Sequence, residues 1–323
     1  MTDNNTPMTS TKIHYSPEYN LTLLGLEELH PFDASKAGKA LALLRQQVGE
    51  NLVAQHLVPV ISEATPEALE LAHSRGYLES LTQSVNVAAA LELGALQDFP
   101  ATAIDQHVLR PMRLAVQGTI DAAHSALQGG IGVNLAGGFH HASHDQGQGF
   151  CLYGDVIIAL RLLQQEGALG AEARVLYVDL DAHQGNGVCR ILQYYEMDHV
   201  LVLDMYNKDV FPNDGVAVKR IDYPVPLRSG IGDEKYIGAL KAALPDAIGD
   251  TPPALVVYNA GTDILTGDPL GDLGVSAEGI GIRDRYVIDT CRDANVPLLI
   301  VPSGGYTQTS HRLIAEMLGY LIH

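Results

Sequence analysis

The sequence of 323 residues is poor in cysteine and in basic residues, and it contains no tryptophan. Its three cysteines, Cys151, Cys189 and Cys291, make an odd number and lack the close spacing of a zinc knuckle. This argues against a disulfide framework and favours the reducing cytoplasm as the location. Lysine and arginine number 20 against 38 acidic residues, which gives a formal net charge of −18. Because nucleic-acid binding requires clustered basic side chains, we expect no nucleic-acid partner.

Long apolar runs are also missing, which argues against a membrane span. The first eleven residues, MTDNNTPMTST, are polar and contain no signal-peptide core, so we predict a disordered leader over residues 1–11. The chain is 46% hydrophobic and shows no repeat and no linker, so we predict one domain over residues 12–323. Its acidity suits a cationic substrate, such as a lysine-bearing peptide or a polyamine.

Short apolar runs alternate with helical patterns along most of the chain. The predicted strands are 131–135, 175–180, 200–203, 255–258 and 298–301. The predicted helices are 34–48, 156–165, 188–195, 235–244, 280–292 and 308–321, with Asp33 as a cap of the first and a further helix starting at Thr65-Pro66. The strands are apolar without strict alternation, as in a parallel sheet buried on both faces. We therefore predict an α/β fold with a doubly wound, mostly parallel sheet flanked by helices.

Polar residues follow several of these strands, and in such sheets sites form at the carboxyl ends of the strands. Asp179, Asp181 and His183 follow the run 174–178. Residues two apart in a strand share a face, so the three side chains can converge where the strand ends. An imidazole with carboxylates is a donor set for a catalytic divalent metal. The alternative is a polar strand end that serves turn chemistry.

Three further strand ends carry candidate groups. Asp263 follows the strand at 255–258 and is the natural third metal ligand, although an Asx turn or helix cap would also explain it. His140 and His141 form a candidate proton-transfer pair, which amide hydrolysis requires. Tyr306 follows two glycines and could donate a hydrogen bond to a developing oxyanion, or it could be an ordinary loop tyrosine.

Two phenylalanines and a glycine-rich segment also need an interpretation. Phe150 and Phe211 could wall a narrow channel for an extended side chain, whereas core packing would explain each of them alone. The GGIG segment at 129–132 precedes a strand and does not follow one, and no Walker-type loop is present. The sequence therefore does not support a nucleotide site.

Taken together, these motifs resemble the zinc-dependent histone deacetylases, which have the arginase–deacetylase fold. The motifs that carry the resemblance are GGFHHA at 137–142, GFC at 149–151, DLDAHQGNG at 179–187, NAGTD at 259–263 and SGGY at 303–306. The class IV branch is the most similar, through YSPEYN at 15–20, HPFD at 30–33, VLRP at 108–111, DAHQGN at 181–186 and YNAGTD at 258–263. The resemblance implies a hydrolase that acts on acyl-lysine.

The resemblance also implies roles for particular residues. Zinc, or iron in the cell, would be held by Asp181, His183 and Asp263. His140 and His141 would be the dyad, with His141 the proton shuttle, and Tyr306 would be the oxyanion donor. Residues implied in substrate binding are Gly149, Phe150, Phe211, Gly304 and Gly305. A structural potassium ion would use Asp179, which also orients His140, together with Asp204 and Met205.

One position departs from the class I pattern. Asn186 stands where a second dyad-supporting aspartate is found, and an amide cannot stabilise an imidazolium as a carboxylate does. We therefore predict a lower pKa for His141 than in an Asn186→Asp variant. Class I relatives also use an acidic residue at the rim of the acyl-lysine tunnel to grip the substrate backbone. The candidates for this residue here are Asp98 and Asp105, between residues 94 and 106.

Other functions stay open at this point. Class IV relatives are associated with removal of long fatty-acyl chains, so the acyl length is not fixed. An acetylpolyamine amidohydrolase is the main alternative, although Gly138-Phe139 replaces the Pro-Gly that such enzymes usually carry before the histidine pair. A ureohydrolase with two manganese ions would need further histidine and aspartate ligands to bridge the pair of metals. A binding protein with a silent site would not need the metal ligands, the histidine pair and Tyr306.

Overall fold

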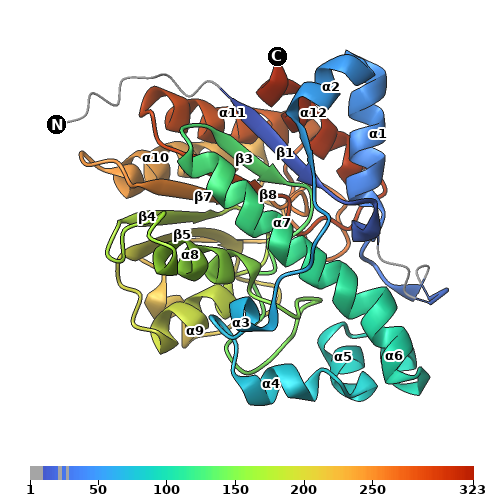
Figure 1. The fold of residues 1–323 in the computed structure, drawn as a ribbon. Helices are drawn as coiled ribbons and strands as arrows, with labels where there is room; N and C mark the ends of the chain where they lie inside the picture. Colours follow the sequence, from blue (N-terminus) through green and yellow to red (C-terminus); the bar gives the residue numbers. More distant parts are fainter. Residues whose placement is uncertain (1–9, 21–23, 27–28) are drawn as a thin grey trace.

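The computed structural model describes residues 10–20, 24–26 and 29–323. Its centre is an eight-stranded sheet with the order β2-β1-β3-β8-β7-β4-β5-β6, in which every neighbouring pair is parallel (Figure 1). The strands are β1 Thr11–Tyr15, β2 Leu57–Pro59, β3 Ile131–Asn134, β4 Val175–Asp179, β5 Val200–Asn207, β6 Tyr223–Leu227, β7 Leu255–Asn259 and β8 Leu298–Val301. The predicted fold class is confirmed.

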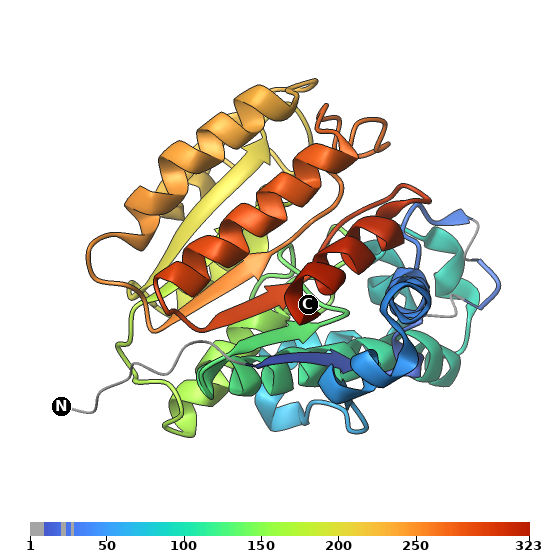
Figure 2. The same cartoon turned by 90° about the horizontal axis from the view of Figure 1, so that it is seen from above.

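Helices cover both faces of the sheet (Figures 1 and 2). The helices that share one core with the sheet are α7 Arg110–Leu127, α8 Asp155–Gln165 and α9 Asn186–Tyr194. Those that share the other core are α1 Lys36–Val48, α10 Asp233–Ile248, α11 Ala277–Asp293 and α12 Ser310–Ile322. Val175 and Tyr177 lie in the first core, whereas Leu176 and Val178 lie in the second. Strand β4 is thus apolar throughout because successive side chains enter different cores.

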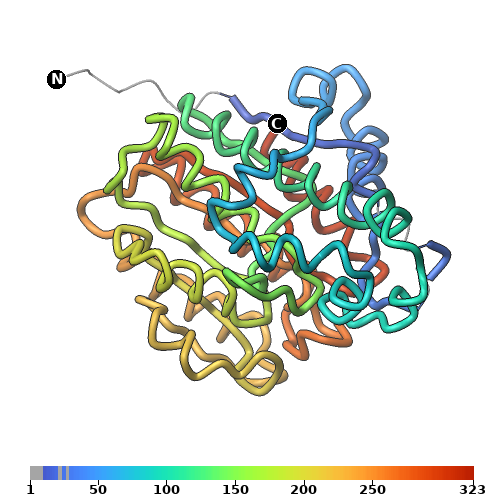
Figure 3. Tube along the Cα trace, turned by 60° about the horizontal axis from the view of Figure 1, so that its bottom comes forward, coloured from blue at the N-terminus to red at the C-terminus, as the bar shows by residue number. Residues whose placement is uncertain are grey.

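A run of short helices connects β2 to α7 and passes across the face turned to the viewer in Figure 3. These helices are α3 Pro66–Leu69, α4 Arg75–Ser80, α5 Ser84–Ala90 and α6 Ala101–Ile104. Helix α2 Glu50–His56 lies between α1 and β2. Thr65 caps α3 as predicted, because its hydroxyl oxygen accepts from the Ala68 N–H at 3.2 Å. None of the helices in the described part of the chain has the length and apolar character that a membrane span requires.

Several element boundaries differ from the prediction by a few residues, among them the two nearest the N-terminus. Helix α1 begins at Lys36 and not at residue 34, because Asp33 Oδ1 accepts from the N–H and the hydroxyl of Ser35 and so forms a turn before the helix. Residues 1–9 of the predicted leader lie outside the described residues. Thr11 pairs with Ile131 in the sheet, so it belongs to β1 and not to the leader.

Candidate active site

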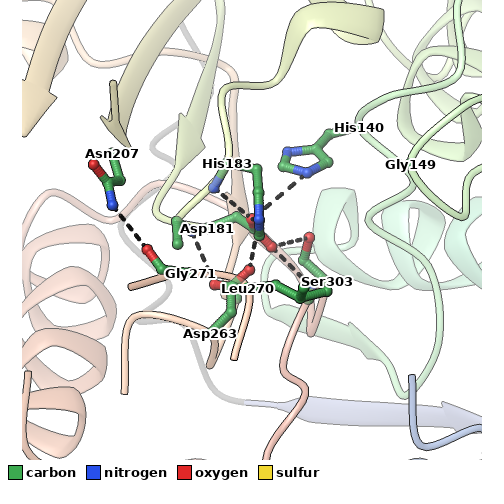
Figure 4. A network of polar contacts seen from close by, with 12 residues as sticks. His140, Gly149, Asp181, His183, Asn207, Asp263, Leu270, Gly271 and Ser303 are labelled. Atoms are coloured by element: carbon green, nitrogen blue, oxygen red, sulfur yellow. Dashed lines mark hydrogen bonds and ion pairs between the residues drawn. The ribbon is translucent and has the colours of Figure 1, made fainter. Parts of the chain in front are cut away.

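Four loops meet at one edge of the sheet. They follow β3, β4, β7 and β8, which are consecutive neighbours in the order β3-β8-β7-β4. Because the strands are parallel, their carboxyl ends lie along the same edge. The loops bring His140, Asp181, His183, Asp263 and Ser303 together, as Figure 4 shows. The prediction that separate strand ends share one site is confirmed.

The candidate metal ligands form one compact and buried cluster. Donor atoms of Asp181, His183 and Asp263 all lie within 4.8 Å of one another. His183 Nδ1 lies 3.0 Å from Asp181 Oδ1 and 3.0 Å from Asp263 Oδ2 (Figure 4). The exposed fraction is 5% for His183 and 0% for the two aspartates. Among the described residues, these three side chains place their donor atoms close enough to share a metal ion. They supply donors for one ion.

The electrostatics of this cluster favour a cation. Burial and the charge of Asp181 raise the pKa of Asp263 to about 7. Burial opposes ionisation of Asp181 as well, but His140 and His183 hold the pKa of that carboxyl well below its usual range. Two carboxylates in one dry site repel each other unless a positive charge lies between them. Two carboxylates and an imidazole with room for further ligands fit a catalytic zinc ion.

The backbone after β8 supports Asp181 from a second side. Asp181 Oδ2 accepts from the Gly304 N–H at 2.8 Å and from the Ser303 hydroxyl at 2.9 Å. A Cβ at position 304 would lie 2.4 Å from Asp263 Oδ2 and 2.5 Å from Asp181 Oδ2. Only glycine allows this approach, which explains why the residue between Ser303 and Gly305 carries no side chain.

His140 is paired with a carboxylate. Its Nδ1 lies 2.8 Å from Asp179 Oδ2, and Asp179 Oδ1 accepts from the Asn259 side-chain amide at 2.8 Å. Its Nε2 lies 3.6 Å from Asp181 Oδ1. Although burial opposes protonation, Asp179 and Asp181 raise the pKa of His140 to about 9. The two carboxylates therefore favour the protonated form of His140 in the metal-free site.

His141 is paired with an amide, as the sequence predicted. Its Nδ1 lies 2.8 Å from Asn186 Oδ1. Because an amide oxygen only accepts, Nδ1 carries the proton and Nε2 is left as a base. Burial, together with the neighbouring His140 and His183, holds the pKa of His141 well below its ordinary value. Its imidazole is neutral at pH 7, which is the form that can take up a proton.

Tyr306 completes the ring of polar groups. Its aromatic centroid lies 6.0 Å from that of His183 and 5.9 Å from that of Phe150. Burial and the charge of Asp181 raise the pKa of Tyr306 well above its ordinary value, so the phenol stays a hydrogen-bond donor. Its backbone N–H donates to Asp268 Oδ2 at 2.8 Å, which fixes the loop after β8.

A cavity of about 80 Å³ adjoins the dyad and Tyr306. His140, His141, Gly304 and Tyr306 line the part that belongs to the site. Most of the remaining wall is apolar. These wall residues are Leu91, Pro111, Met112, Ala115, Leu135, Ala136, Phe139 and Pro302. The site therefore opens into a mainly apolar chamber.

Three of the predicted substrate-binding residues, Gly149, Phe150 and Phe211, do not all line the same space. Gly149 and Phe150 line the cavity. A Cβ at Gly149 would lie 2.5 Å from the His141 ring and 3.1 Å from the Phe211 ring, so this glycine lies between the two rings. Phe211 is 43% exposed, and it lines a separate surface groove next to the site. Phe211 therefore lies at the rim.

Sequence reasoning missed Lys36, which lines the cavity and is 5% exposed. Its ammonium donates to the Ser303 carbonyl oxygen and lies 4.7 Å from the Phe32 ring centroid. Burial lowers its pKa to about 8, although Asp263, Asp181 and Asp268 oppose this shift. Lys36 thus places a cationic group in a mainly apolar chamber, which Asp33 and His30 also line. A lysine in the first turn of an amphipathic helix gave no signal of burial.

Two buried aspartates that hold the site loops were also missed. Asp155 accepts from the Gly138 and Phe139 N–H groups at 3.0 and 2.8 Å, and so fixes the turn before the histidine pair. Asp268 accepts from Tyr306, Leu270 and Gly271. Asp155 begins helix α8, where an acidic residue ordinarily indicates favourable interaction with the helix dipole.

Two of the residues expected around a potassium ion, Asp179 and Asp204, lie side by side. Asp179 and Asp204 are opposite each other in the β4–β5 register, and both are fully buried. Asp204 Oδ2 accepts from the Gly185 N–H at 3.0 Å, whereas Oδ1 is a buried atom with no hydrogen-bond partner. Burial and Asp179 raise the pKa of Asp204 well above its ordinary value.

Asp98 and Asp105 were the candidates for an acidic residue at the tunnel rim. Asp105 forms an ion pair with Arg113 at 2.8 Å.

Comparison with known proteins agrees with this geometry. The family model described as the histone deacetylase domain matches residues 30–320. Histone deacetylase 2 of Arabidopsis thaliana is 39% identical over 312 residues, which cover 97% of this chain and 79% of that protein. Histone deacetylase 8 of Xenopus laevis is 30% identical over 258 residues, or 75% of each chain. The crystal structure of the HDA15 HD domain superposes with a TM-score of 0.76 at 23% identity, covering 97% of this chain and 90% of that one, which supports the fold.

Proposed function

Because the chain belongs to the histone deacetylase family and is a hydrolase with a buried Asp-His-Asp metal site, we propose that it is a zinc-dependent lysine deacylase whose acyl substrates extend beyond acetyl. The observation that carries this proposal is the continuity between the polar site and the apolar cavity. His140, His141 and Tyr306 line the same space as Leu91, Met112 and Leu135. We also propose the class IV branch, which the Asn186 position and the HPFD motif at 30–33 support.

The residues divide the chemistry between them. Asp181, His183 and Asp263 hold the metal, which when bound polarises the acyl carbonyl and lowers the pKa of a water molecule. His141 Nε2 accepts the proton from the attacking water and passes it to the leaving ε-amine. The Tyr306 hydroxyl donates a hydrogen bond to the developing oxyanion. His140 pairs through Nδ1 with Asp179, which orients its ring beside the metal site.

The apolar wall supports acyl chains longer than acetyl. Each methylene buried in a hydrocarbon-lined space contributes about 0.8 kcal/mol, or roughly a fourfold gain in binding. Lys36 adds a cationic group to the same chamber, which suits a carboxylate product. The chamber therefore accommodates the acyl group, while the ε-amine of lysine lies toward Phe150 and the rim residue Phe211.

A substrate panel tests the proposal. Peptides with acetyl-, octanoyl- and myristoyl-lysine, together with acetylated polyamines, should be compared by kcat/KM on zinc-loaded enzyme. We expect turnover of lysine peptides and an increase of kcat/KM with acyl length. Replacement of Ala115 by methionine should reduce activity on the longest chain and leave acetyl-lysine turnover close to wild type, because Ala115 lies in the apolar wall. Activity on acetyl-lysine alone would contradict the longer-chain assignment.

Acetylpolyamine hydrolysis is the second candidate, and the net charge of −18 favours it because a polyamine is cationic. The panel separates the two, since a polyamine hydrolase would leave the acyl-lysine peptides intact. We further propose that Asp179 and Asp204, with the Met205 backbone, hold a potassium ion, which the unpartnered Asp204 oxygen supports. A cytoplasmic location is supported by three buried cysteines that are all unpaired.

A further inference from the structure

Arg283 lies on helix α11, and its exposed fraction is 0%. A fully buried guanidinium is rare, because its loss of hydration is costly unless hydrogen bonds and a counter-charge compensate. Similar apolar side chains on α11, such as Val287 and Ile288, fill the same core without this cost. The contacts of Arg283 therefore indicate why a charged residue occupies this position.

One edge of the guanidinium forms an ion pair. Arg283 Nε and Nη2 lie 2.9 and 2.8 Å from Asp284 Oδ1. The Tyr258 hydroxyl donates to the same oxygen at 2.5 Å. This pairing neutralises the buried charge, but it leaves the remaining nitrogen, Nη1, directed elsewhere.

Nη1 donates to two backbone carbonyls that belong to different loops of the site. It lies 3.2 Å from the Leu180 oxygen and 2.5 Å from the Gly261 oxygen. Leu180 stands between Asp179 and Asp181, at the end of β4. Gly261 lies two residues before Asp263, at the end of β7. One nitrogen thus connects the segment that carries Asp181 and His183 with the segment that carries Asp263.

These two segments are in close contact. A Cβ at Gly261 would lie 2.7 Å from Asp181 Cα, so the second segment passes directly against the first metal ligand. A shift of either backbone would change the separation of the two carboxylates. Arginine suits this place because its planar fork can pair with a carboxylate on one edge and reach two acceptors on the other.

We propose that Arg283 is a positioning residue for the metal, which fixes the distance between Asp181 and Asp263 by holding the Leu180 and Gly261 carbonyls together. The proposal rests on the metal site described above. Arg283 itself lies outside the donor cluster and acts through the two backbone segments. Outer groups of this kind typically change metal affinity by about 10–100-fold when they are altered.

The test compares three variants as full-length, metal-stripped proteins. Arg283→Lys keeps the charge beside Asp284 but has one ammonium in place of the fork, so it cannot hold both carbonyls and the ion pair. Arg285→Lys is the matched control, because it makes the same chemical change on the same helix at an exposed residue. Asp284→Asn removes the ion pair and leaves the carbonyl contacts of Arg283 in place.

Zinc affinity should be measured by competition with a chromophoric chelator, ligand geometry by the visible absorption of the cobalt(II) form, and stability by thermal unfolding of the metal-free proteins. We expect Arg283→Lys to weaken zinc binding about 10–100-fold and to alter the cobalt spectrum. Arg285→Lys should match wild type in all three measurements. Asp284→Asn should lower the melting temperature while its folded fraction binds zinc within a few-fold of wild type.

Each other outcome overturns the proposal. Wild-type zinc affinity and cobalt absorption in Arg283→Lys would show that the arginine does not position the ligands. Failure of that variant to fold would make Arg283 an element of the fold alone. Equal weakening in Asp284→Asn would assign the effect to the ion pair. A wild-type protein that binds no zinc would overturn the metal site itself, whereas tight binding in both wild type and Arg283→Lys overturns only the role of Arg283.

Discussion

The two sides of the site differ in charge although both are buried. On one side His140 contacts Asp179 and lies near Asp181, and its pKa is raised to about 9. On the other side His141, the next residue in the chain, contacts Asn186, and its pKa is held well below normal. The rings are only 4.0 Å apart between centroids. Burial alone does not distinguish these histidines. Asp179 and Asp181 favour the protonated form of His140, whereas His140 and His183 disfavour protonation of His141, whose Nδ1 has no carboxylate partner.

The largest effect is expected from removal of a metal ligand. His183→Ala removes one of the three donors from the metal cluster and leaves Asp181 and Asp263 to repel each other. We expect loss of stoichiometric zinc and of measurable turnover. Metal analysis after gel filtration and a deacylation assay would check this. A variant that retains one zinc ion per chain would contradict the assignment of the ligands.

The next largest effect is expected from removal of His141, the proposed base. His141→Ala removes the base while the metal cluster stays complete, so zinc content should be unchanged and kcat should fall by roughly 10²–10⁴. Zinc content and kcat should be measured on the same sample. If His140→Ala lowered kcat while His141→Ala left it intact, the assignment of the base would be reversed.

A smaller loss is expected from Tyr306→Phe. This change removes one hydroxyl and leaves the ring contacts with Phe150 and His183 in place. Loss of one oxyanion donor typically lowers kcat by roughly 10²–10³. Steady-state kinetics would show a fall in kcat with little change in KM. Turnover close to wild type would remove Tyr306 from the mechanism.

The smallest effect is expected from a change at Asn186, the partner of His141. Asn186→Asp would give both histidines a carboxylate partner. A carboxylate stabilises the imidazolium and raises the pKa of His141, and a base must be unprotonated to act. The acidic limb of the kcat/KM profile should therefore move to higher pH, by about one unit or more. Gln193→Glu adds the same charge at an exposed position of α9 and should leave the limb in place. An unmoved limb in Asn186→Asp would count against this account.

Much of the site could be predicted because its residues are tied to strand ends. Asp179, Asp181 and His183 stand at spacings of two after an apolar run, and Asp263 follows another such run. Parallel strands place their carboxyl ends at one edge, so the pattern predicts convergence without any further information. The family resemblance then supplied the roles of these groups.

The residues that were missed act through long-range contacts. Lys36 contacts Ser303, a residue 267 positions away in the chain, and Arg283 contacts Leu180 at a separation of 103. Nothing local in the sequence distinguishes these side chains from solvent-exposed basic residues on amphipathic helices. Strands β2 and β6 were missed for a different reason, because both contain proline. Strand β1 was missed because its sequence, TKIHY, is mostly polar and forms no apolar run.

Strand β6 forms one border of the sheet and contains Pro224 and Pro226, both exposed. Proline has no N–H to offer, so the outer side of this strand cannot form a regular ladder with a strand from another molecule. The opposite border, β2, is only three residues long and ends in Pro59. Both margins of an otherwise extensible sheet are thus blunted, which protects the sheet from edge-to-edge aggregation.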